Sequence, residues 1–262
     1  GNYDLCIQIH EDNIKVDIIE SDNEIPKIAM ENHTDVPLEI MLEDRNWDKD
    51  AATGIQVTTL QKFRDLFSDE VVKKNEMIKI EEVTILFSDL RASTAMYNKI
   101  GDASAFSLVL EQFDFLKRIV RKNEGALVKT LGDAIMAAFA DPKKALEAAL
   151  EIQREIASFN ESLPEEKKLV IKLGINNGPC IAVNLNNNLD YFGTAVNLAA
   201  RLEGKSLGGD VAVSANLLAD PEIKEFIYLQ HIEKHEVLAP IKGFDEEFTI
   251  FRLTWPTHIL SH

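Results

Sequence analysis

Two aspartates stand at the ends of predicted strands, where their carboxylates could hold metal ions. Asp89 follows the apolar run Val83–Phe87, which predicts a buried strand, and the loop after it is rich in N–H groups and opens a helix. Asp133 belongs to the pair Gly132-Asp133, a plausible hairpin turn between two apolar strands. Taken singly, the first is equally a helix cap and the second an ordinary turn residue. If the two strands are neighbours in one sheet, the carboxylates can share two metal ions about 4 Å apart.

A third segment, residues 190–201, could bind a charged phosphoryl group. Asn197 and Arg201 are four residues apart on a predicted helix, so their side chains project to the same side. A guanidinium that donates two hydrogen bonds, beside an amide donor, suits phosphate oxygens. A capped helix with one surface arginine explains the same residues without any ligand.

These three segments, in this order, resemble the catalytic domain of the class III nucleotidyl cyclases, the adenylate and guanylate cyclases. The similarity covers roughly residues 81–253. It rests on four motifs of this chain, which read F-x-D-[IL]-R, K-T-x-G-D-x-x-M-A-x-F, D-x-x-G-x-x-V-N-x-A-x-R and a late K-G. Each motif is weak alone, whereas the four in the right order and spacing are strong.

The resemblance implies a metal centre and a base-recognition pair. In that family two Asp side chains and a backbone carbonyl hold two metal ions, and their counterparts here are Asp89, Asp133 and Leu90. We therefore expect two Mg²⁺ or Mn²⁺ ions per active site. The Lys–Asp pair that recognises adenine in the family matches Lys129 and Asp190. Because guanylate-specific members tend to carry Glu and Cys at those positions, this pair favours ATP.

The resemblance also assigns the groups around the phosphates. The Asn and Arg of the transition state match Asn197 and Arg201, and a phosphate-binding lysine matches Lys242. The implied reaction is that of an adenylate cyclase: the 3′-hydroxyl of ATP attacks the α-phosphate, which forms 3′,5′-cyclic AMP and releases pyrophosphate. One departure, Ala92-Ser93 in place of the family's Gly-Phe, bears on the geometry of the phosphate loop.

The spacing of Lys129 and Asp133 leads to an expectation about assembly. They are only four positions apart, across a strand and a turn, so they cannot easily reach both ends of one extended nucleotide. In the family the metal-binding acids come from one chain, and the base-reading and Asn/Arg residues come from its partner. We therefore expect a head-to-tail homodimer with two composite sites. A guanylate cyclase, and a cyclase-like domain that senses nucleotide without catalysis, are the alternative functions.

The site requires a sheet that brings these segments together, and residues 81–262 predict one. Strands and helices alternate in the order βαββαβ with extensions, which indicates an α+β, ferredoxin-like cyclase domain with its helices on one face. The predicted helices span about 103–122, 142–160 and 194–204. The predicted strands span 83–87, 127–131, 134–139, 169–175, 180–184, 210–213, 234–238 and 247–253, with a turn at Asn177-Gly178.

Residues 1–80 are predicted to form a small, mainly β accessory region that ends in a connecting helix over about 50–72. Three stretches that alternate apolar and polar residues predict a small antiparallel sheet: Tyr3–Ile9, Ile14–Ile19 and Pro37–Leu42. The segment Val57–Phe67 resembles, more weakly, an uncharacterised accessory domain often fused upstream of bacterial cyclases. The helix could pack on its own sheet, transmit a signal to the catalytic domain or aid dimerisation.

Composition argues against several other classes of protein. The 262 residues include 28 Lys and Arg against 44 Asp and Glu, a net charge of −16, which disfavours binding to nucleic acid or to an acidic membrane surface. No apolar run approaches the about 20 residues that span a bilayer, and no signal peptide is visible, so we expect a cytoplasmic protein. The two cysteines form no C-x-x-C metal motif. Because the chain begins Gly1-Asn2 without Met, we expect the native protein to continue upstream.

Overall fold

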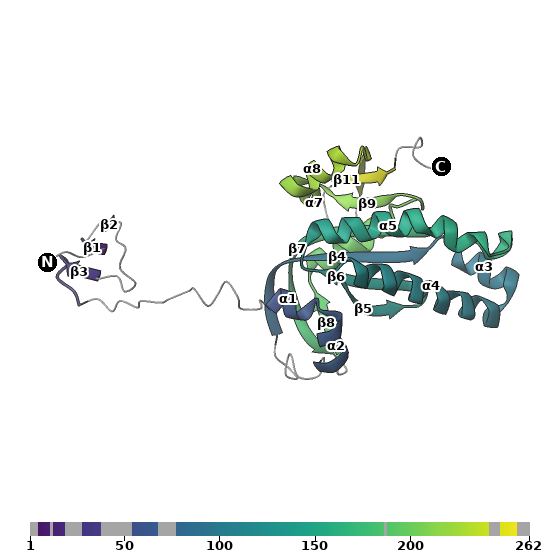
Figure 1. The fold of residues 1–262 in the computed structure, drawn as a ribbon, viewed down its shortest axis with the longest axis horizontal. Helices are drawn as coiled ribbons and strands as arrows, with labels where there is room; N and C mark the ends of the chain where they lie inside the picture. Colours follow the sequence, from purple (N-terminus) through teal and green to yellow (C-terminus); the bar gives the residue numbers. More distant parts are fainter. Residues whose placement is uncertain are drawn as a thin grey trace. The chain divides into compact units, whose positions relative to one another are not determined.

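The computed structural model describes residues 5–10, 13–18, 28–37, 54–67, 77–185, 188–240 and 247–255. Contacts within the chain divide it into two compact units, Gly1–Ala51 and Ala52–His262 (Figure 1). All the residues that the sequence analysis singled out for chemistry belong to the larger unit.

The smaller unit contains a three-stranded sheet with β1 (Leu5–Ile9) at its centre. β2 (Ile14–Ile18) pairs with β1 antiparallel, as predicted, whereas β3 (Ile28–Asn32), a strand that was not predicted, pairs with β1 parallel, so the sheet is mixed rather than antiparallel. In β3 the first two residues are partly buried and the other three are exposed, so burial does not alternate along this strand. The strand predicted over Pro37–Leu42 lies outside the described residues except for Pro37, which is not in a strand.

The larger unit is built on an eight-stranded sheet in the order β10-β11-β9-β7-β4-β6-β5, with β8 paired to β7 (Figure 1). Its strands are β4 (Met77–Leu90), β5 (Ala126–Leu131), β6 (Ala134–Phe139), β7 (Ile171–Leu185), β8 (Asn188–Phe192), β9 (Val211–Ser214), β10 (Glu233–Pro240) and β11 (Glu247–Thr254). Its helices are α1 (Gly54–Thr58), α2 (Gln61–Phe67), α3 (Ser93–Ile100), α4 (Asp102–Lys122), α5 (Pro142–Glu161), α6 (Thr194–Glu203), α7 (Ala215–Ala219) and α8 (Pro221–Leu229). The order β4-α4-β5-β6-α5-β7 confirms the predicted βαββαβ core, with β9, β10 and β11 as its extension.

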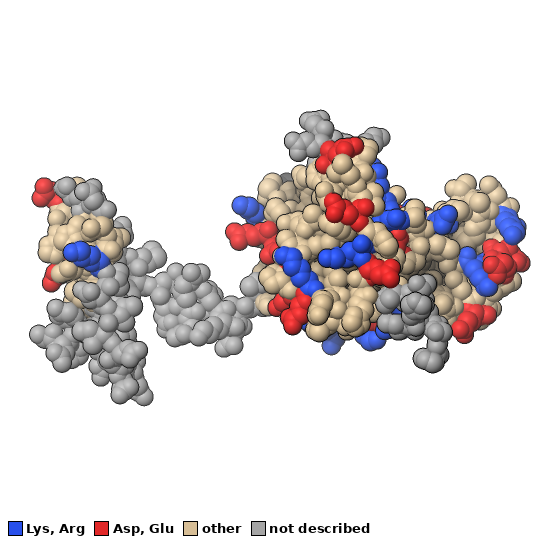
Figure 2. Space-filling model, turned by 90° about the horizontal axis from the view of Figure 1, so that it is seen from above, with Lys and Arg blue, Asp and Glu red and all other residues tan. Residues whose placement is uncertain are grey.

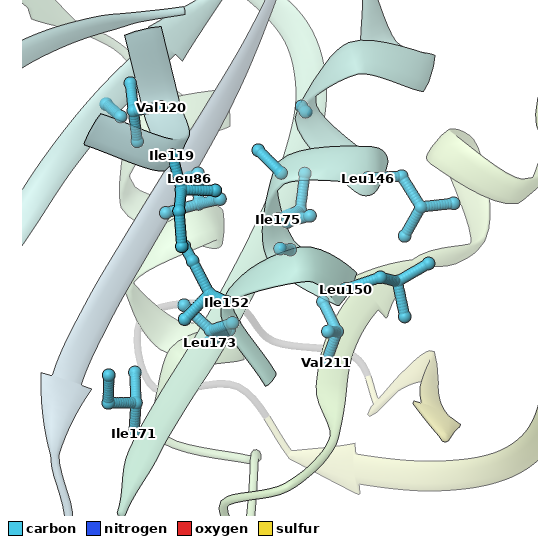
Figure 3. Close-up of a cluster of buried hydrophobic side chains, with 14 of the residues drawn as sticks. Leu86, Ile119, Val120, Leu146, Leu150, Ile152, Ile171, Leu173, Ile175 and Val211 are labelled. Carbon is cyan, nitrogen blue, oxygen red and sulfur yellow. The ribbon is translucent and has the colours of Figure 1, made fainter. Parts of the chain in front are cut away.

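One face of the sheet is covered by α4 and α5 (Figure 3). α4 presents its buried residues at a helical spacing, with Leu116, Ile119 and Val120 fully buried. α5 begins after Asp141, whose carboxylate accepts hydrogen bonds from N–H groups of the first turn, and Pro142 occupies the first helical position. The residues labelled in this core come from α4, α5, β4, β7 and β9: Leu86, Ile119, Val120, Leu146, Leu150, Ile152, Ile171, Leu173, Ile175 and Val211.

The opposite face is covered by α6, so the prediction that all helices lie on one face is wrong. Val196 and Ala199 of α6 share a second buried cluster with Ile85 and Phe87 of β4. The physical reason lies in β4, whose residues 83–88 are all buried, so that both faces of this strand require a cover.

A single strand, β7, replaces the two strands and the turn predicted at Asn177-Gly178. Asn177 lies opposite Thr84 of β4 and accepts a hydrogen bond from its hydroxyl at 3.1 Å. Asn176 donates to the carbonyl of Ala195 at 2.9 Å. Residues typical of turns can thus continue a strand when tertiary partners satisfy their side chains. The helix predicted to open after the Asp89 loop is confirmed as α3, whereas β8, α7 and α8, each of nine residues or fewer, were not predicted.

The connecting helix predicted over about 50–72 is instead two short helices, α1 and α2, separated by Thr59 and Leu60. Thr58 and Thr59 donate their hydroxyls to the carbonyl of Ile55, at 3.2 and 2.8 Å, and so compete with a further turn of helix. Both helices belong to the larger compact unit. The boundary between the accessory region and the catalytic domain, expected after residue 80, stays a prediction. Among the described helices, none combines the length and the apolar character needed to cross a bilayer.

Gly174 of β7 lets α6 approach the sheet closely, which predicts the effect of a single methyl group. A Cβ at this position would lie 2.1 Å from the backbone nitrogen of Glu203. We expect Gly174→Ala to destabilise the fold by about 1–3 kcal/mol and to lower the melting temperature by several degrees. Gly204→Ala is the matched control, because its Cβ would meet nothing closer than 3.5 Å. Equal melting temperatures for the two variants would contradict the close approach.

Candidate active site

The two aspartates predicted to bind metal lie at the same edge of the sheet, the one where β4 ends and the neighbouring strand β6 begins. β4 and β6 are antiparallel neighbours, with Ser88 opposite Ile135. Asp89 follows Ser88 in β4, and Asp133 lies in the turn that leads into β6. The prediction that their strands are neighbours is confirmed, so the two carboxylates come from adjacent positions and can serve one centre.

A lysine that the sequence analysis missed lies beside Asp89. Lys172 of β7 is opposite Asp89 in the ladder, and its ammonium contacts the carboxylates of Asp89 at 2.9 Å and Glu203 at 2.5 Å. Burial alone would lower the pKa of Lys172, but the hydrogen bonds to Glu203 and Asp89 outweigh burial and raise this pKa. The signal in the sequence was a lysine inside the otherwise apolar run Ile171–Ile175.

Glu203, at the end of α6, shares Lys172 with Asp89 and interacts electrostatically with both aspartates. Burial raises the pKa of Glu203, and its hydrogen bond with Lys172 lowers it. The negative charges of Asp89 and Asp133 raise the pKa of Glu203 further, so all three acids interact. With all four groups ionised, three carboxylates and one ammonium form a cluster of net negative charge, which favours the approach of a cation.

Oxygen atoms at this edge of the sheet suit a divalent cation. The Oδ2 atom of Asp133 is buried and has no hydrogen-bond partner among the described residues. Such an oxygen is costly to bury, and a bound cation would compensate it. Leu90 has its side chain in the core, so only its backbone carbonyl could serve as the predicted third ligand. In the described part of the chain no three His, Cys, Asp or Glu side chains form a metal site by themselves, so substrate or water would complete the coordination.

The loop after Leu90 adopts a backbone conformation that favours glycine. Ala92, at the position where the cyclases carry Gly, has φ 58° and ψ 32° directly before α3. Arg91 anchors the loop through its N–H to the carbonyl of Val170 at 2.9 Å and through its guanidinium to the carbonyl of Leu207 at 3.0 Å. The loop thus keeps a left-handed residue despite the Cβ, which costs about 1–2 kcal/mol.

The structure brings Lys129 and Asp190 together, as a base-recognition pair requires. Lys129 of β5 donates to a carboxylate oxygen of Asp190 in β8 at 2.6 Å. The other carboxylate oxygen accepts the backbone N–H of Tyr191 at 2.8 Å, and the ammonium lies 5.6 Å from the centre of the Phe192 ring. The side chain of Asp190 is 8% exposed and that of Lys129 is 34% exposed, so the acceptor is held in place while the donor can reach a ligand.

Asn197 and Arg201 are exposed on α6, one helical turn apart. Neither side chain makes a hydrogen bond or ion pair with another residue in the part of the chain that the structure describes. Both are therefore available to a ligand or to a second chain. Lys242, predicted to bind phosphate, lies outside the described residues.

On the face of the larger unit shown in Figure 2, Lys and Arg alternate with Asp and Glu rather than gathering by sign. A nucleic-acid-binding surface concentrates basic residues on one face or stripe. No such concentration is visible on this face, and the absence of nucleic-acid binding stays a prediction from the net charge of −16.

Comparison with known proteins assigns the chain to one family. Residues 75–250 match the family model of the adenylate and guanylate cyclase catalytic domain, and the chain belongs to this family. An adenylate cyclase of Anabaena cylindrica is 28% identical over 185 residues, which cover 65% of this chain and 36% of that protein. The receptor-type guanylate cyclase gcy-13 of Caenorhabditis elegans is 28% identical over 148 residues, 52% of this chain and 14% of that protein. The crystal structure of the adenylyl cyclase CyaB from P. aeruginosa has a TM-score of 0.58 at 25% identity and covers 68% of this chain and 96% of that one.

Family membership establishes a nucleotidyl cyclase catalytic domain. Domains of this class bind nucleotides, depend on divalent metal ions and dimerise. The chain spans 36% of the Anabaena protein and 14% of the C. elegans protein, so it corresponds to a part of each. Because these two relatives are named for different nucleotides, the choice between ATP and GTP has to be argued from the site.

Replacement of Ala92 by Gly tests the strain in the loop before α3. We expect Ala92→Gly to stabilise the fold by about 0.5–1 kcal/mol, because relief of left-handed strain exceeds the entropy that Gly adds to the unfolded chain. Urea unfolding measures this difference as a shift of the midpoint at constant slope. Ala157→Gly, at an exposed position inside α5, should instead destabilise by about 1 kcal/mol. Equal losses of stability in the two variants would show that residue 92 is unstrained.

Proposed function

We propose that this chain is an adenylate cyclase, which converts ATP to 3′,5′-cyclic AMP and pyrophosphate. The observation that supports ATP is the Lys129–Asp190 pair, held at 2.6 Å. Adenine offers an acceptor at N1 and a donor at its exocyclic N6, which match an ammonium and a carboxylate. Guanine offers a donor and an acceptor at those two positions, so both contacts would become repulsive.

The acids and the carbonyl at the edge of the sheet would hold two Mg²⁺ or Mn²⁺ ions. Asp89, Asp133 and the carbonyl of Leu90 supply oxygen ligands, which these ions prefer. When bound, the ions lower the pKa of the attacking 3′-hydroxyl and neutralise the triphosphate. Lys172 orients the Asp89 carboxylate through its contact at 2.9 Å.

The exposed residues of α6 would act on the reacting phosphate. The guanidinium of Arg201 donates to the oxygens of the α-phosphate, where negative charge grows in the transition state. Asn197, one turn earlier, offers an amide that orients the nucleotide relative to Arg201. Lys242 would add a further positive charge, a role that stays a prediction from the family resemblance.

We propose that two copies of the chain, arranged head to tail, complete each site. Lys129 is in β5, and Asp133 is in the turn directly after that strand, so one copy holds both sets of residues close together. A nucleotide has its base and its phosphates at opposite ends, and it would therefore take one set from each copy. The unpartnered Asn197 and Arg201 support this arrangement, because they are available to a second chain. A symmetric pair then has two equivalent sites. The cytoplasmic location also stays a prediction.

The direct test of the reaction is an assay of the purified chain for cyclic nucleotide from ATP and from GTP, with Mg²⁺ or Mn²⁺. We expect cyclic AMP from ATP, with a kcat/KM at least about tenfold above that for GTP. The double variant Lys129→Glu with Asp190→Cys should move the preference toward GTP, whereas Lys224→Glu, on the exposed side of α8, should leave it unchanged. A wild type that prefers GTP is a guanylate cyclase, and one that binds ATP without forming product is a nucleotide sensor. Either result contradicts the proposed activity.

Complementation tests whether the sites are shared. Asp89→Ala and Arg201→Ala should each be nearly inactive, because each removes one half of every site. Mixed in equal amounts, they should recover about a quarter of the wild-type rate, since half of the dimers are mixed and each of these has one intact site. Asp89→Ala mixed with Asp133→Ala is the matched control, which should not recover, because both changes affect the same half. With mixed dimers confirmed by mass, the absence of recovery in the first mixture would rule out composite sites.

A further inference from the structure

The segment α1–α2 contacts both strands that carry the Lys129–Asp190 pair. Figure 1 shows α1 and α2 beside β8, and the two helices belong to the same compact unit as the sheet. None of the motifs that define the active site includes this segment. Its contacts nevertheless reach backbone atoms within two residues of Lys129 and directly beside Asp190.

Arg64 of α2 is a buried cation that binds β8 next to Asp190. Its guanidinium donates to the carbonyl of Leu189 and, at 3.1 Å, to the carbonyl of Thr58 at the end of α1. It also lies 5.6 Å from the centre of the Tyr191 ring. Arg64 is only 7% exposed, so few other groups can replace these contacts. Because Leu189 and Tyr191 flank Asp190, Arg64 holds both neighbours of the carboxylate.

Tyr191 makes a second contact between β8 and α1. Its hydroxyl donates to the carbonyl of Thr58 at 3.0 Å, the acceptor that Arg64 also uses. Burial raises the pKa of Tyr191 to about 12, so the hydroxyl stays protonated and remains a donor near neutral pH. The backbone N–H of Tyr191 is bonded to the Asp190 carboxylate at 2.8 Å. Tyr191 is therefore bonded to α1 through its side chain and to the Asp190 carboxylate through its backbone.

Gln61 makes the corresponding contact with β5, the outermost strand on its side of the sheet. Its side-chain carbonyl accepts the backbone N–H of Leu127 at 2.7 Å. The Gln61 amide donates to Asp65 at 2.8 Å, and Asp65 pairs with Arg121 of α4 at 2.9 Å, so the orientation of Gln61 is fixed. Leu127 is two residues before Lys129, where the β5–β6 ladder shifts register. Gln61 thus supports β5 at the point where strand pairing is least regular.

We infer that Arg64 and Gln61 are positioning residues for base recognition, which hold β8 and β5 at the separation at which Asp190 and Lys129 meet. The inference rests on the proposed role of that pair in reading adenine. A donor and an acceptor discriminate between bases only if their spacing is fixed, because a mobile pair can adapt to either edge. Neither Arg64 nor Gln61 belongs to the metal-binding edge of the sheet. Their loss should therefore affect nucleotide binding and selectivity more than the chemical step.

The test compares Arg64→Met and Gln61→Met with the wild type in steady-state kinetics on ATP and on GTP. For Arg64→Met we expect a KM for ATP about tenfold higher, a similar fall in the ATP-to-GTP ratio of kcat/KM, and a kcat changed less than about threefold. Gln61→Met should change the same quantities in the same direction but less, because it loses a single bond to a strand. Arg64→Lys, which keeps the charge and one of the two donor directions, should restore part of the ratio.

Two controls separate positioning from lost packing and lost stability. Arg118→Met removes another arginine that contacts a carboxylate, Glu155 at 2.8 Å, and an aromatic ring, Phe115 at 5.7 Å, but these lie on α4 and α5. Asn160→Ala removes two hydrogen bonds to Leu169, each 2.8 Å long, and lowers stability at the end of α5. Unchanged selectivity in both Arg64→Met and Gln61→Met would overturn the inference. An equal fall of selectivity in Asn160→Ala, at equal loss of stability, would also overturn it.

Calorimetric titration of ATP and GTP onto the same variants separates this inference from the proposed function. A wild type that forms no cyclic AMP but binds ATP more tightly than GTP contradicts the proposed activity. In that case, loss of the binding preference in Arg64→Met still supports the positioning role. A wild type that forms cyclic AMP selectively, together with variants that bind both nucleotides as it does, overturns the inference and leaves the proposed function intact.

Discussion

The positions of the predicted metal ligands depend on β4, a strand that pairs with a neighbour on each side and whose residues 83–88 are buried on both faces. β6 and β7 flank it, α4 and α5 cover one face, and α6 covers the other. None of these elements can shift without exposing core residues, so Asp89 at the end of the strand has a fixed position. Asp133 and Lys172 come from the hairpin and the strand on either side of it. The same ladder that builds the core therefore sets the geometry of the carboxylates.

Local patterns were enough to predict most of the core elements. The bounds of α4 and α5 agree with the sequence to within one residue, because their apolar residues recur at helical spacing and Asp141 with Pro142 marks the start of α5. The Gly132-Asp133 turn is local in the same way. β7 was not predictable, since Asn177-Gly178 is a genuine turn signal that only contacts with distant residues override. The sequence did not predict that α6 covers the opposite face, because a short apolar run does not indicate that both faces of the strand are covered.

Some residues of the candidate site were also predictable from the sequence, and others were not. Lys129 and Asp190 are 61 residues apart, yet the motifs predicted that they would meet, and the structure places them in contact. Lys172 and Glu203 were missed because their importance depends on what lies opposite them in the ladder or across the sheet. Arg64 is an extreme case: its partner Leu189 is 125 residues away, and a single arginine in an amphipathic helix carries no signal of burial.

In the proposed arrangement, each active site takes its residues from two chains. The most direct measurement is the rate of cyclic AMP formation per chain over a dilution series, with the fraction of dimer determined in parallel by sedimentation. The rate per chain should fall in proportion to the dimer fraction as the protein is diluted, because under this proposal a single chain holds only half of each site. A monomer that retains the full rate per chain would contradict shared sites.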